Sequence, residues 1–214
     1  MIHEILKKSK TAVIIGAMDG IYFDEIDSAL PKYNLEKVVM VEPISWHFEM
    51  LVNNYKQYPN FEFENSAITM YNGKTSMITI PPWNFDKVGA WAVGCSMIGS
   101  QYKTERGTNL LGDFDSVKSN SIQVEVNTIT FKNLLLKHNL TTVDFIKVDA
   151  EGHDWIIVSQ INLDAVKPLA VYFEIAHLSK DTLETAIRWF NKSNYDFYNV
   201  GDDAHEGCAV KRSI

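Results

Sequence analysis

The chain has 214 residues, of which 46% are hydrophobic and 22% are charged, a balance that excludes a disordered protein and suits a single domain over residues 1–214. Its net charge of -7 does not favour binding to nucleic acids or anionic membranes. Cys95 and Cys208 fit no metal or disulfide motif, and no apolar run is long enough to span a bilayer. We therefore expect a soluble, cytoplasmic protein with neither nucleic-acid nor membrane partners.

The first predicted elements alternate between strands and helices. Thr11–Ile15 is a short apolar run that predicts a strand, and it stops at the turn Gly16–Gly20. Helical spacing of apolar residues follows and should end at Pro31. Val38–Val41 predicts the second strand, which ends at Glu42 and precedes another helix.

A third strand is predicted at Phe61–Glu64, and Met77–Ile80 suggests a hairpin across Asn72 and Gly73. From residue 81 to about residue 121 the periodicity fails. A long irregular segment in a compact domain is usually functional, so we interpret it as a lid or an acceptor-binding insertion. The alternative is that it forms extra strands packed against the core.

The second half of the chain continues the alternation. A short strand at 124–128 and a helix at 131–140 precede Val143–Val148, which predicts a buried strand. Leu169–Phe173 predicts another strand, and Asp181 a helix N-cap. Two closing strands, 195–200 and 208–211, suggest an antiparallel pair. This order predicts an α/β fold with a mostly parallel sheet covered by helices on both faces.

Two polar strand ends are candidates for a nucleotide site. Gly16 and Gly20 let the backbone come close to a ligand, although they do not form a complete dinucleotide motif. Glu42, at the end of the second strand, could accept hydrogen bonds from a ribose. The alternative is a tight turn followed by a solvated glutamate.

The central strand ends in a cluster of polar residues, Asp149, Glu151, His153 and Asp154. Ligands of open α/β sheets bind beyond the carboxyl ends of the strands, so we expect the chemistry here. The alternative for the two acids Asp149 and Glu151 is that they cap the following helix. Lys147 is expected to pair with these carboxylates.

The chain resembles the FkbM family of S-adenosylmethionine-dependent methyltransferases. The resemblance rests on six segments in the same order, Ile15–Gly20, Val41–Pro43, Asn65–Ala67, Val126–Ile129, Asp144–His153 and Tyr172–Glu174. It implies a class I methyltransferase (Rossmann-like) fold, with a seven-stranded sheet whose last strand is antiparallel.

The resemblance also implies which residues bind the cofactor. The amino-acid part of S-adenosylmethionine would lie against Gly16, Ala17 and Gly20, its ribose against Glu42, and its adenine against Ser66 and Ala67. Family members often carry an acid where this chain has Ile14. We therefore expect Asp19 or Asp149 to hold the ammonium group of the cofactor.

Methyl transfer to a hydroxyl needs an aligned acceptor and a base. His153 is the candidate base because its ordinary pKa lies near neutral pH, and Asp149 is the second candidate. Asp154 could orient the imidazole of His153 if the turn brings the two together. The acceptor is expected to contact Glu151, Glu174, His177, Trp83 and Trp91. The tryptophans, with Tyr102, could stack on a sugar or fill a satellite core.

These residues lead us to predict an O-methyltransferase acting on a small-molecule or glycan hydroxyl. A nucleotide-cofactor oxidoreductase and a noncatalytic binding module are the alternatives. A divalent metal could be held by the three acids Asp149, Glu151 and Glu174 with two histidines, but their spacing matches no dedicated metal motif, so no metal site is predicted.

Overall fold

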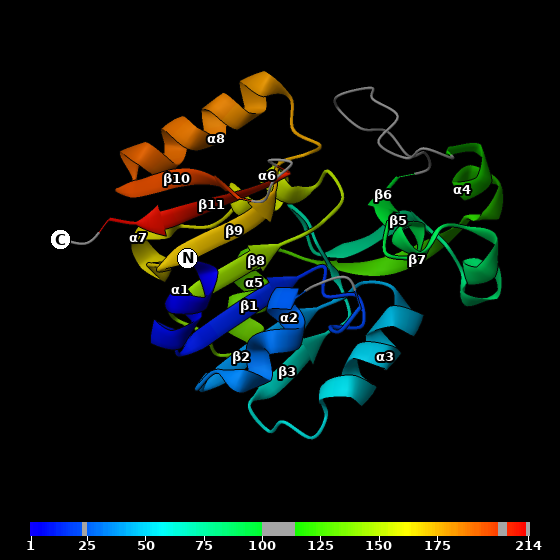
Figure 1. Cartoon of the computed structure of the whole chain (residues 1–214), viewed down its shortest axis with the longest axis horizontal. Helices are drawn as coiled ribbons and strands as arrows, with labels where there is room; N and C mark the ends of the chain where they lie inside the picture. Colours follow the sequence, from blue (N-terminus) through cyan, green and yellow to red (C-terminus); the bar gives the residue numbers. More distant parts are fainter. Residues whose placement is uncertain (23–24, 100–113, 201–204, 213–214) are drawn as a thin grey trace.

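The computed structural model describes residues 1–22, 25–99, 114–200 and 205–212, and within these ranges the strands form two sheets (Figure 1). The larger sheet has the order β10-β11-β9-β8-β1-β2-β3. Its strands are β1 (Thr11–Ile15), β2 (Lys37–Val41), β3 (Phe61–Glu64), β8 (Phe145–Val148), β9 (Ala170–Glu174), β10 (Tyr195–Val200) and β11 (Glu206–Lys211).

The strand directions confirm the predicted class I methyltransferase fold. Pairing is parallel from β3 through β2, β1 and β8 to β9, and β11 is antiparallel to both of its neighbours. Parallel strands are buried on both faces, which explains why β1 and β2 are nearly continuous apolar runs. The carboxyl ends of the parallel strands therefore meet at one edge of the sheet.

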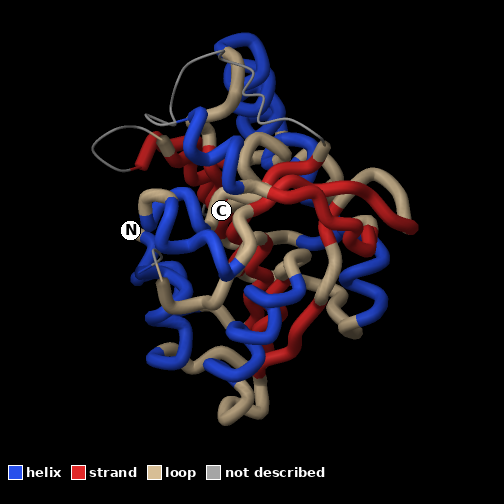
Figure 2. Tube along the Cα trace, turned by 90° about the vertical axis from the view of Figure 1, so that its right-hand side faces the viewer, coloured by secondary structure: helices blue, strands red, loops and turns tan. Residues whose placement is uncertain are grey.

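Helices cover both faces of the large sheet (Figure 2). One face packs against α1 (Ile2–Lys8), α2 (Glu25–Ala29), the 3-10 helix η1 (Leu30–Lys32) and α3 (Ser45–Tyr55). The other packs against α5 (Phe131–Lys137), α6 (Asp154–Val158), α7 (Leu163–Val166) and α8 (Lys180–Lys192). Among the described residues, no helix combines the length and the apolar composition needed to cross a bilayer.

The smaller sheet has the order β4-β7-β5-β6 and lies beside the carboxyl edge of the large one (Figure 1). Its strands are β4 (Ala67–Ile68), β5 (Gly73–Thr79), β6 (Met97–Ile98) and β7 (Ile122–Ile129). The predicted hairpin across Asn72 and Gly73 is wrong, because β7 lies between β4 and β5. All seven residues of β5 pair with β7, whereas the two-residue β4 could offer far fewer hydrogen bonds.

The segment from residue 81 to residue 121 is attached to this second sheet. Its described parts are η2 (Pro82–Lys87), η3 (Ala90–Val93), β6 and α4 (Phe114–Asn120), and they enclose a small apolar cluster of Ile78, Ile80, Ala92, Met97 and Val117. Tyr102 lies outside the described residues. The segment thus forms structure of its own, and its role as a lid stays a prediction.

Two predicted helix boundaries are wrong for local reasons. Pro31 lies inside the 3-10 helix η1, where the first turn tolerates a residue without a backbone N–H. The cap of α8 is Ser179 and not Asp181, because the Ser179 hydroxyl accepts a hydrogen bond from the Thr182 backbone N–H at 3.2 Å. Asp181 lies in the first turn, where a carboxylate is favourable.

Candidate active site

Four residues stand in one row at the carboxyl edge of the large sheet. Ile15 pairs with Val41 on one side and with Val148 on the other, and Val148 pairs with Phe173. The residues that follow these four, one on each strand, are Gly16, Glu42, Asp149 and Glu174. The register of the sheet therefore brings the predicted cofactor residues and an acid of the predicted acceptor site to adjacent strand ends.

Glycine is required at position 16 because the end of the neighbouring strand β8 approaches it closely. Its φ is +79°, and a Cβ atom built on it would lie 1.7 Å from the carbonyl oxygen of Asp149. The backbone is held in this position by hydrogen bonds from Gly16 N–H to the Val41 carbonyl and from Asp149 N–H to the Ile15 carbonyl. A side chain at Gly16 would separate the ends of β1 and β8.

Glu42 is buried and holds two turns of the site. Its carboxylate accepts hydrogen bonds from the backbone N–H groups of Met18, at 3.0 Å, and Ile44, at 2.8 Å. Burial raises the pKa of Glu42 to about 8, because the charged form is poorly solvated, although the two N–H groups oppose this shift. The side chain thus fixes the glycine turn and still faces the cavity described next.

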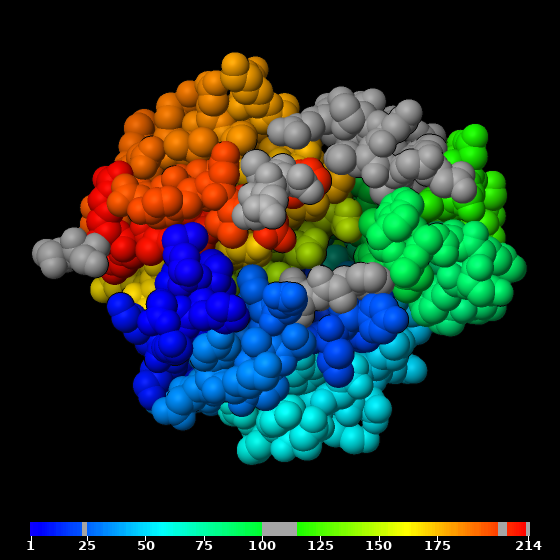
Figure 3. Space-filling model, in the orientation of Figure 1, coloured from blue at the N-terminus to red at the C-terminus, as the bar shows by residue number. Residues whose placement is uncertain are grey.

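A cavity of about 240 Å³ opens at this strand edge, large enough for a small organic molecule, since a water molecule occupies only about 30 Å³. Figure 3 shows a hollow between the blue N-terminal part and the green second sheet. Nine of the predicted site residues line the cavity: Gly16, Ala17, Glu42, Ser66, Ala67, Trp91, Asp149, Glu151 and His153. Residues from β1, β2, β8, α6 and the second sheet therefore meet at one site.

Five predicted site residues do not line this cavity: Glu174 and His177, which are described below, and Asp19, Gly20 and Trp83. Asp19 is buried, and its carboxylate accepts hydrogen bonds from the backbone N–H groups of Ile21 and Tyr22. Gly20 packs against α3, where an added Cβ would lie 2.4 Å from the Tyr55 ring. The side chain of Trp83 is on the surface, 66% exposed.

The turn after β8 is built by Asp154. Its carboxylate accepts hydrogen bonds from the backbone N–H groups of Ala150 and Gly152, both at 3.0 Å, and burial raises its pKa to about 7. Asp154 therefore shapes the turn. Both of its carboxylate oxygens bind backbone N–H groups, whereas an orienting contact with His153 was conditional on the geometry of this turn. Glu151 has a φ of +49°, an uncommon conformation for a residue with a side chain.

His153 is the N-cap residue of α6, and it faces the cavity without capping the helix through its side chain. Burial lowers the pKa of His153, because the imidazolium form would be poorly solvated. The imidazole is therefore neutral at neutral pH and can accept a proton.

Lys147 forms a buried ion pair that the sequence did not reveal. Its Nζ lies 3.4 Å from Asp27 Oδ2 and 3.9 Å from Asp149 Oδ2, and both Lys147 and Asp27 are almost completely buried. The pairing of Lys147 with Asp149 was predicted, but the closer partner is on α2. A lysine between apolar neighbours indicates that a carboxylate is buried beside it. The sequence alone does not show which acidic residue provides that carboxylate.

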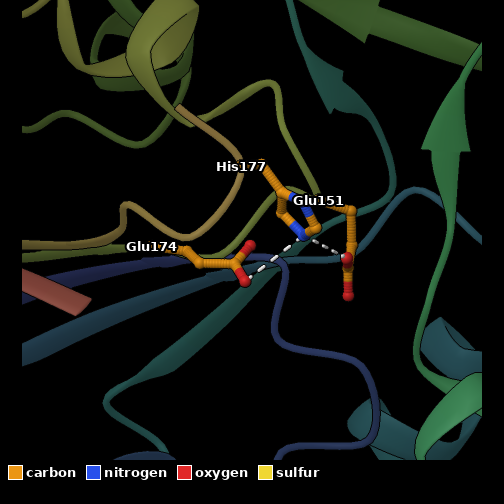
Figure 4. Close-up of side chains that lie close together, drawn as sticks. All are labelled: Glu151, Glu174 and His177. Atoms are coloured by element: carbon orange, nitrogen blue, oxygen red, sulfur yellow. Dashed lines mark hydrogen bonds and ion pairs between the residues drawn. The ribbon is translucent and has the colours of Figure 1, made fainter. Parts of the chain in front are cut away.

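Glu151, Glu174 and His177 converge beside the cavity (Figure 4). The Nε2 atom of His177 lies 3.2 Å from Glu151 Oε2 and 3.3 Å from Glu174 Oε1. Burial, and the charges of Glu151 and other nearby acids, raise the pKa of Glu174 to about 10. A second, polar cavity of about 220 Å³ is lined by Glu151 and Glu174 together with Asp149, His205 and Glu206.

A model of the FkbM methyltransferase domain matches residues 15–197. The chain belongs to the FkbM methyltransferase family. This FkbM chain is similar to the crystal structure of methyltransferase FkbM from Methylobacillus flagellatus KT, with a TM-score of 0.56 and 14% sequence identity. The alignment covers 94% of this chain and 43% of the other, so the chain spans less than half the length of that relative.

A second similar structure is the O-methyltransferase from Bacillus cereus in complex with SAH, with a TM-score of 0.47 and 12% identity over 98% of this chain and 78% of the other. No curated protein matches the sequence at a significant level. The likeness to the methyltransferase from Methylobacillus flagellatus KT supports the fold of this FkbM protein.

Part of the cavity wall in this FkbM protein was not predicted. Met77 and Ile98 come from the second sheet, and Gly94 and Ser96 from the segment before β6. Their only signal in the sequence was that they fall within or just before the irregular segment. The same segment contacts α3, because the His47 ring stacks on Phe85 with ring centroids 5.9 Å apart.

Gly16→Ala should lower the free energy of unfolding of this FkbM protein by more than about 2 kcal/mol, because the new methyl group collides with the Asp149 carbonyl in a strained backbone conformation. Gly99→Ala is the matched control, since Gly99 also has a positive φ but nothing within 4 Å of an added Cβ. Urea denaturation measures both variants. Equal losses would contradict a specific collision at Gly16.

The raised pKa of Glu42 predicts a pH dependence of stability. The folded protein binds the Glu42 proton more tightly than the unfolded chain, so this contribution to stability is present below about pH 4.5 and is lost as the pH rises to about 8. Glu42→Gln should flatten this decline by at most about 1.4 kcal/mol per pH unit.

Urea denaturation of the ligand-free protein at a series of pH values checks this slope. Glu49→Gln, at an exposed position of α3, is the control and should keep the wild-type slope. A Glu42→Gln slope equal to that of the wild type would show that Glu42 is charged in the folded state.

Proposed function

We propose that the protein is an S-adenosylmethionine-dependent O-methyltransferase that modifies a hydroxyl group of a sugar or glycan. The observation that carries this proposal is the convergence of Gly16, Glu42 and Asp149 on one cavity at the carboxyl edge of the sheet. Open α/β sheets bind nucleotide-like ligands at this edge. Membership of the FkbM methyltransferase family supports the reaction type.

The cofactor would lie across the ends of β1 and β2. Each carboxylate oxygen of Glu42 already accepts one backbone N–H and keeps a lone pair for a ribose hydroxyl. Ser66 and Ala67 line the part of the cavity beyond Glu42, where the adenine is proposed to bind. The half-exposed carboxylate of Asp149 can accept hydrogen bonds from the ammonium group, whereas Asp19 is already engaged in its own turn.

The chain supplies alignment and a base for the transfer. When bound, S-adenosylmethionine supplies an electrophilic methyl group on a sulfonium. The neutral imidazole of His153 would accept the proton of the acceptor hydroxyl as that oxygen is methylated. The transfer would leave His153 protonated and would yield a methyl ether and a neutral thioether.

The acceptor would extend from the part of the first cavity that is lined by His153 and Trp91 into the second, polar cavity, since Glu151 lines both. Glu151 and Glu174 offer carboxylate oxygens to several hydroxyl groups, and this pattern suits a polyol such as a sugar. Trp91 lines the first cavity and can stack on an apolar sugar face. The side chain of Trp83 lies on the surface and does not line the cavity. A contact between Trp83 and the acceptor therefore stays a prediction.

Composition supports the proposed setting of this reaction. The net charge of -7 disfavours nucleic acid as the acceptor, so we propose a small molecule or a glycan. Cys95 and Cys208 are both buried, neither forms a disulfide within the described residues, and burial raises the pKa of each thiol. Neutral thiols outside disulfides suit a reducing compartment, and we propose the cytoplasm.

S-adenosylhomocysteine should stabilise the protein against heat, by about 2.7 kcal/mol at a concentration one hundred times its dissociation constant. Glu42→Ala should weaken this stabilisation, because the ribose loses its acceptor, while Glu49→Ala on the surface should not. A thermal shift assay measures both variants. Stabilisation by NAD or NADP and none by S-adenosylhomocysteine would favour an oxidoreductase instead.

His153→Ala should lower kcat about 10²-fold or more, because the hydroxyl proton loses its acceptor, and should leave the affinity for S-adenosylhomocysteine unchanged. Transfer of a labelled methyl group to a panel of glycosides gives kcat, and titration calorimetry gives the affinity. His3→Ala, at an exposed position of α1, is the matched control. Near-normal turnover in His153→Ala would move the role of base to Asp149.

A further inference from the structure

We propose that Glu151, Glu174 and His177 form a site for a divalent cation of the manganese or zinc class. The site lies between the two cavities, where a bound cation would face the acceptor. The proposed cation site is inferred from the geometry of this cluster, and only its role in acceptor binding rests on the proposed function. The cation site and the proposed function can therefore fail separately.

The spacing of the three side chains fits a coordination sphere. Two atoms that each bind a cation at about 2.1 Å lie about 3.0 Å apart at a right angle and about 3.4 Å apart at a tetrahedral angle. His177 Nε2 lies 3.2 Å from Glu151 Oε2 and 3.3 Å from Glu174 Oε1. One ligand atom from each of the three residues lies within 4.8 Å of the others, so small side-chain shifts could close the set around one ion.

The cluster contains buried polar atoms without hydrogen-bond partners in the described part of the chain. These atoms are Glu174 Oε2 and His177 Nδ1, and only 7% of the His177 surface is exposed. Buried polar atoms are nearly always satisfied, so an unsatisfied carboxylate oxygen calls for an explanation. A cation at the cluster would satisfy Glu174, because its carboxylate can bind through either oxygen or both.

The surrounding charge also favours a cation. Asp149, Asp154 and Glu151 lie near Glu174, so a negative charge on Glu174 is unfavourable when no cation is bound. The nearby Lys147 is closer to Asp27 on α2 than to Asp149. A cation would reduce the repulsion among these carboxylates.

The backbone directs Glu151 toward this cluster. Glu151 adopts a φ of +49°, and the next residue, Gly152, has a φ of +90°. The Asp154 carboxylate stabilises this turn by accepting the N–H groups on either side of Glu151. An uncommon conformation that is held by a buried carboxylate is typical of a functional turn.

The position of the site gives the cation a role. Glu151 lines both cavities, whereas Glu174 lines the polar one. Two carboxylate oxygens and one imidazole nitrogen leave positions open on a six-coordinate ion. An acceptor hydroxyl that binds at an open position would have a lowered pKa, which assists its deprotonation. Without a cation, His177 could instead bridge the two glutamates as an imidazolium.

Direct binding of Mn²⁺ and Zn²⁺ to the whole, chelator-treated protein tests the site. We expect saturable binding of one equivalent, measured by titration calorimetry for both ions and by electron paramagnetic resonance for Mn²⁺. Glu174→Gln and His177→Ala should each weaken binding at least 10-fold. Glu184→Gln, at an exposed position of α8, is the matched control and should bind as the wild type does.

A spectroscopic signature separates coordination from a general charge effect. Bound Mn²⁺ should show coupling to a nitrogen nucleus that disappears in His177→Ala. Binding that both substitutions leave unchanged, or no saturable binding of either ion up to millimolar concentration, would overturn the proposal. If His177→Ala fails to fold, Glu174→Gln, which keeps the side-chain shape, still provides the decisive comparison.

Binding of S-adenosylhomocysteine is measured in the same samples. Glu174 and His177 do not line the cofactor cavity, so both variants should keep that affinity, which also shows that they are folded. Metal binding without cofactor binding would overturn the proposed function and retain the metal site. Cofactor binding without metal binding would overturn the metal site and retain the proposed function.

Discussion

The pairing register of β2, β1, β8 and β9 is the constraint on which the site depends. It places Gly16, Glu42, Asp149 and Glu174 side by side at one sheet edge. The close contact of Gly16 with the Asp149 carbonyl keeps β1 and β8 together at the point where both turn toward the cavity. A slip of one residue in any of these strands would turn its side chains to the opposite face and remove its contribution to the site.

The groups around the cavity share an electrostatic setting. Burial raises the pKa of Glu42 and Glu174 and lowers that of His153, so each shift favours the neutral form. Neutral groups can give or take a proton without first breaking a strong ion pair. The ion pair of Lys147 with Asp27, both almost completely buried, lies in the wall of the cavity and joins α2 to the central strand.

The sequence predicted the strands and their polar ends well, because apolar runs that stop at glycines or acids reflect local physics. The convergence of Gly16 and Glu42 followed from the parallel sheet that those runs imply. Strand pairings that depend on residues distant in the chain could not be predicted from the sequence. The position of β7 between β4 and β5 was missed for that reason. Asp19 was assigned to the cofactor, yet its carboxylate binds its own turn, a local competition that residue type alone does not decide.

Helix α3 supports both sides of the site at once. Tyr55 donates a hydrogen bond to the Gly20 carbonyl at the end of the glycine turn, and near the start of the same helix His47 stacks on Phe85 of the irregular segment. One helix thus supports the glycine turn and the segment that follows β5. A change that tilts α3 would disturb the proposed cofactor and acceptor sites together, so a substitution far from the cavity would resemble the loss of two contacts at once.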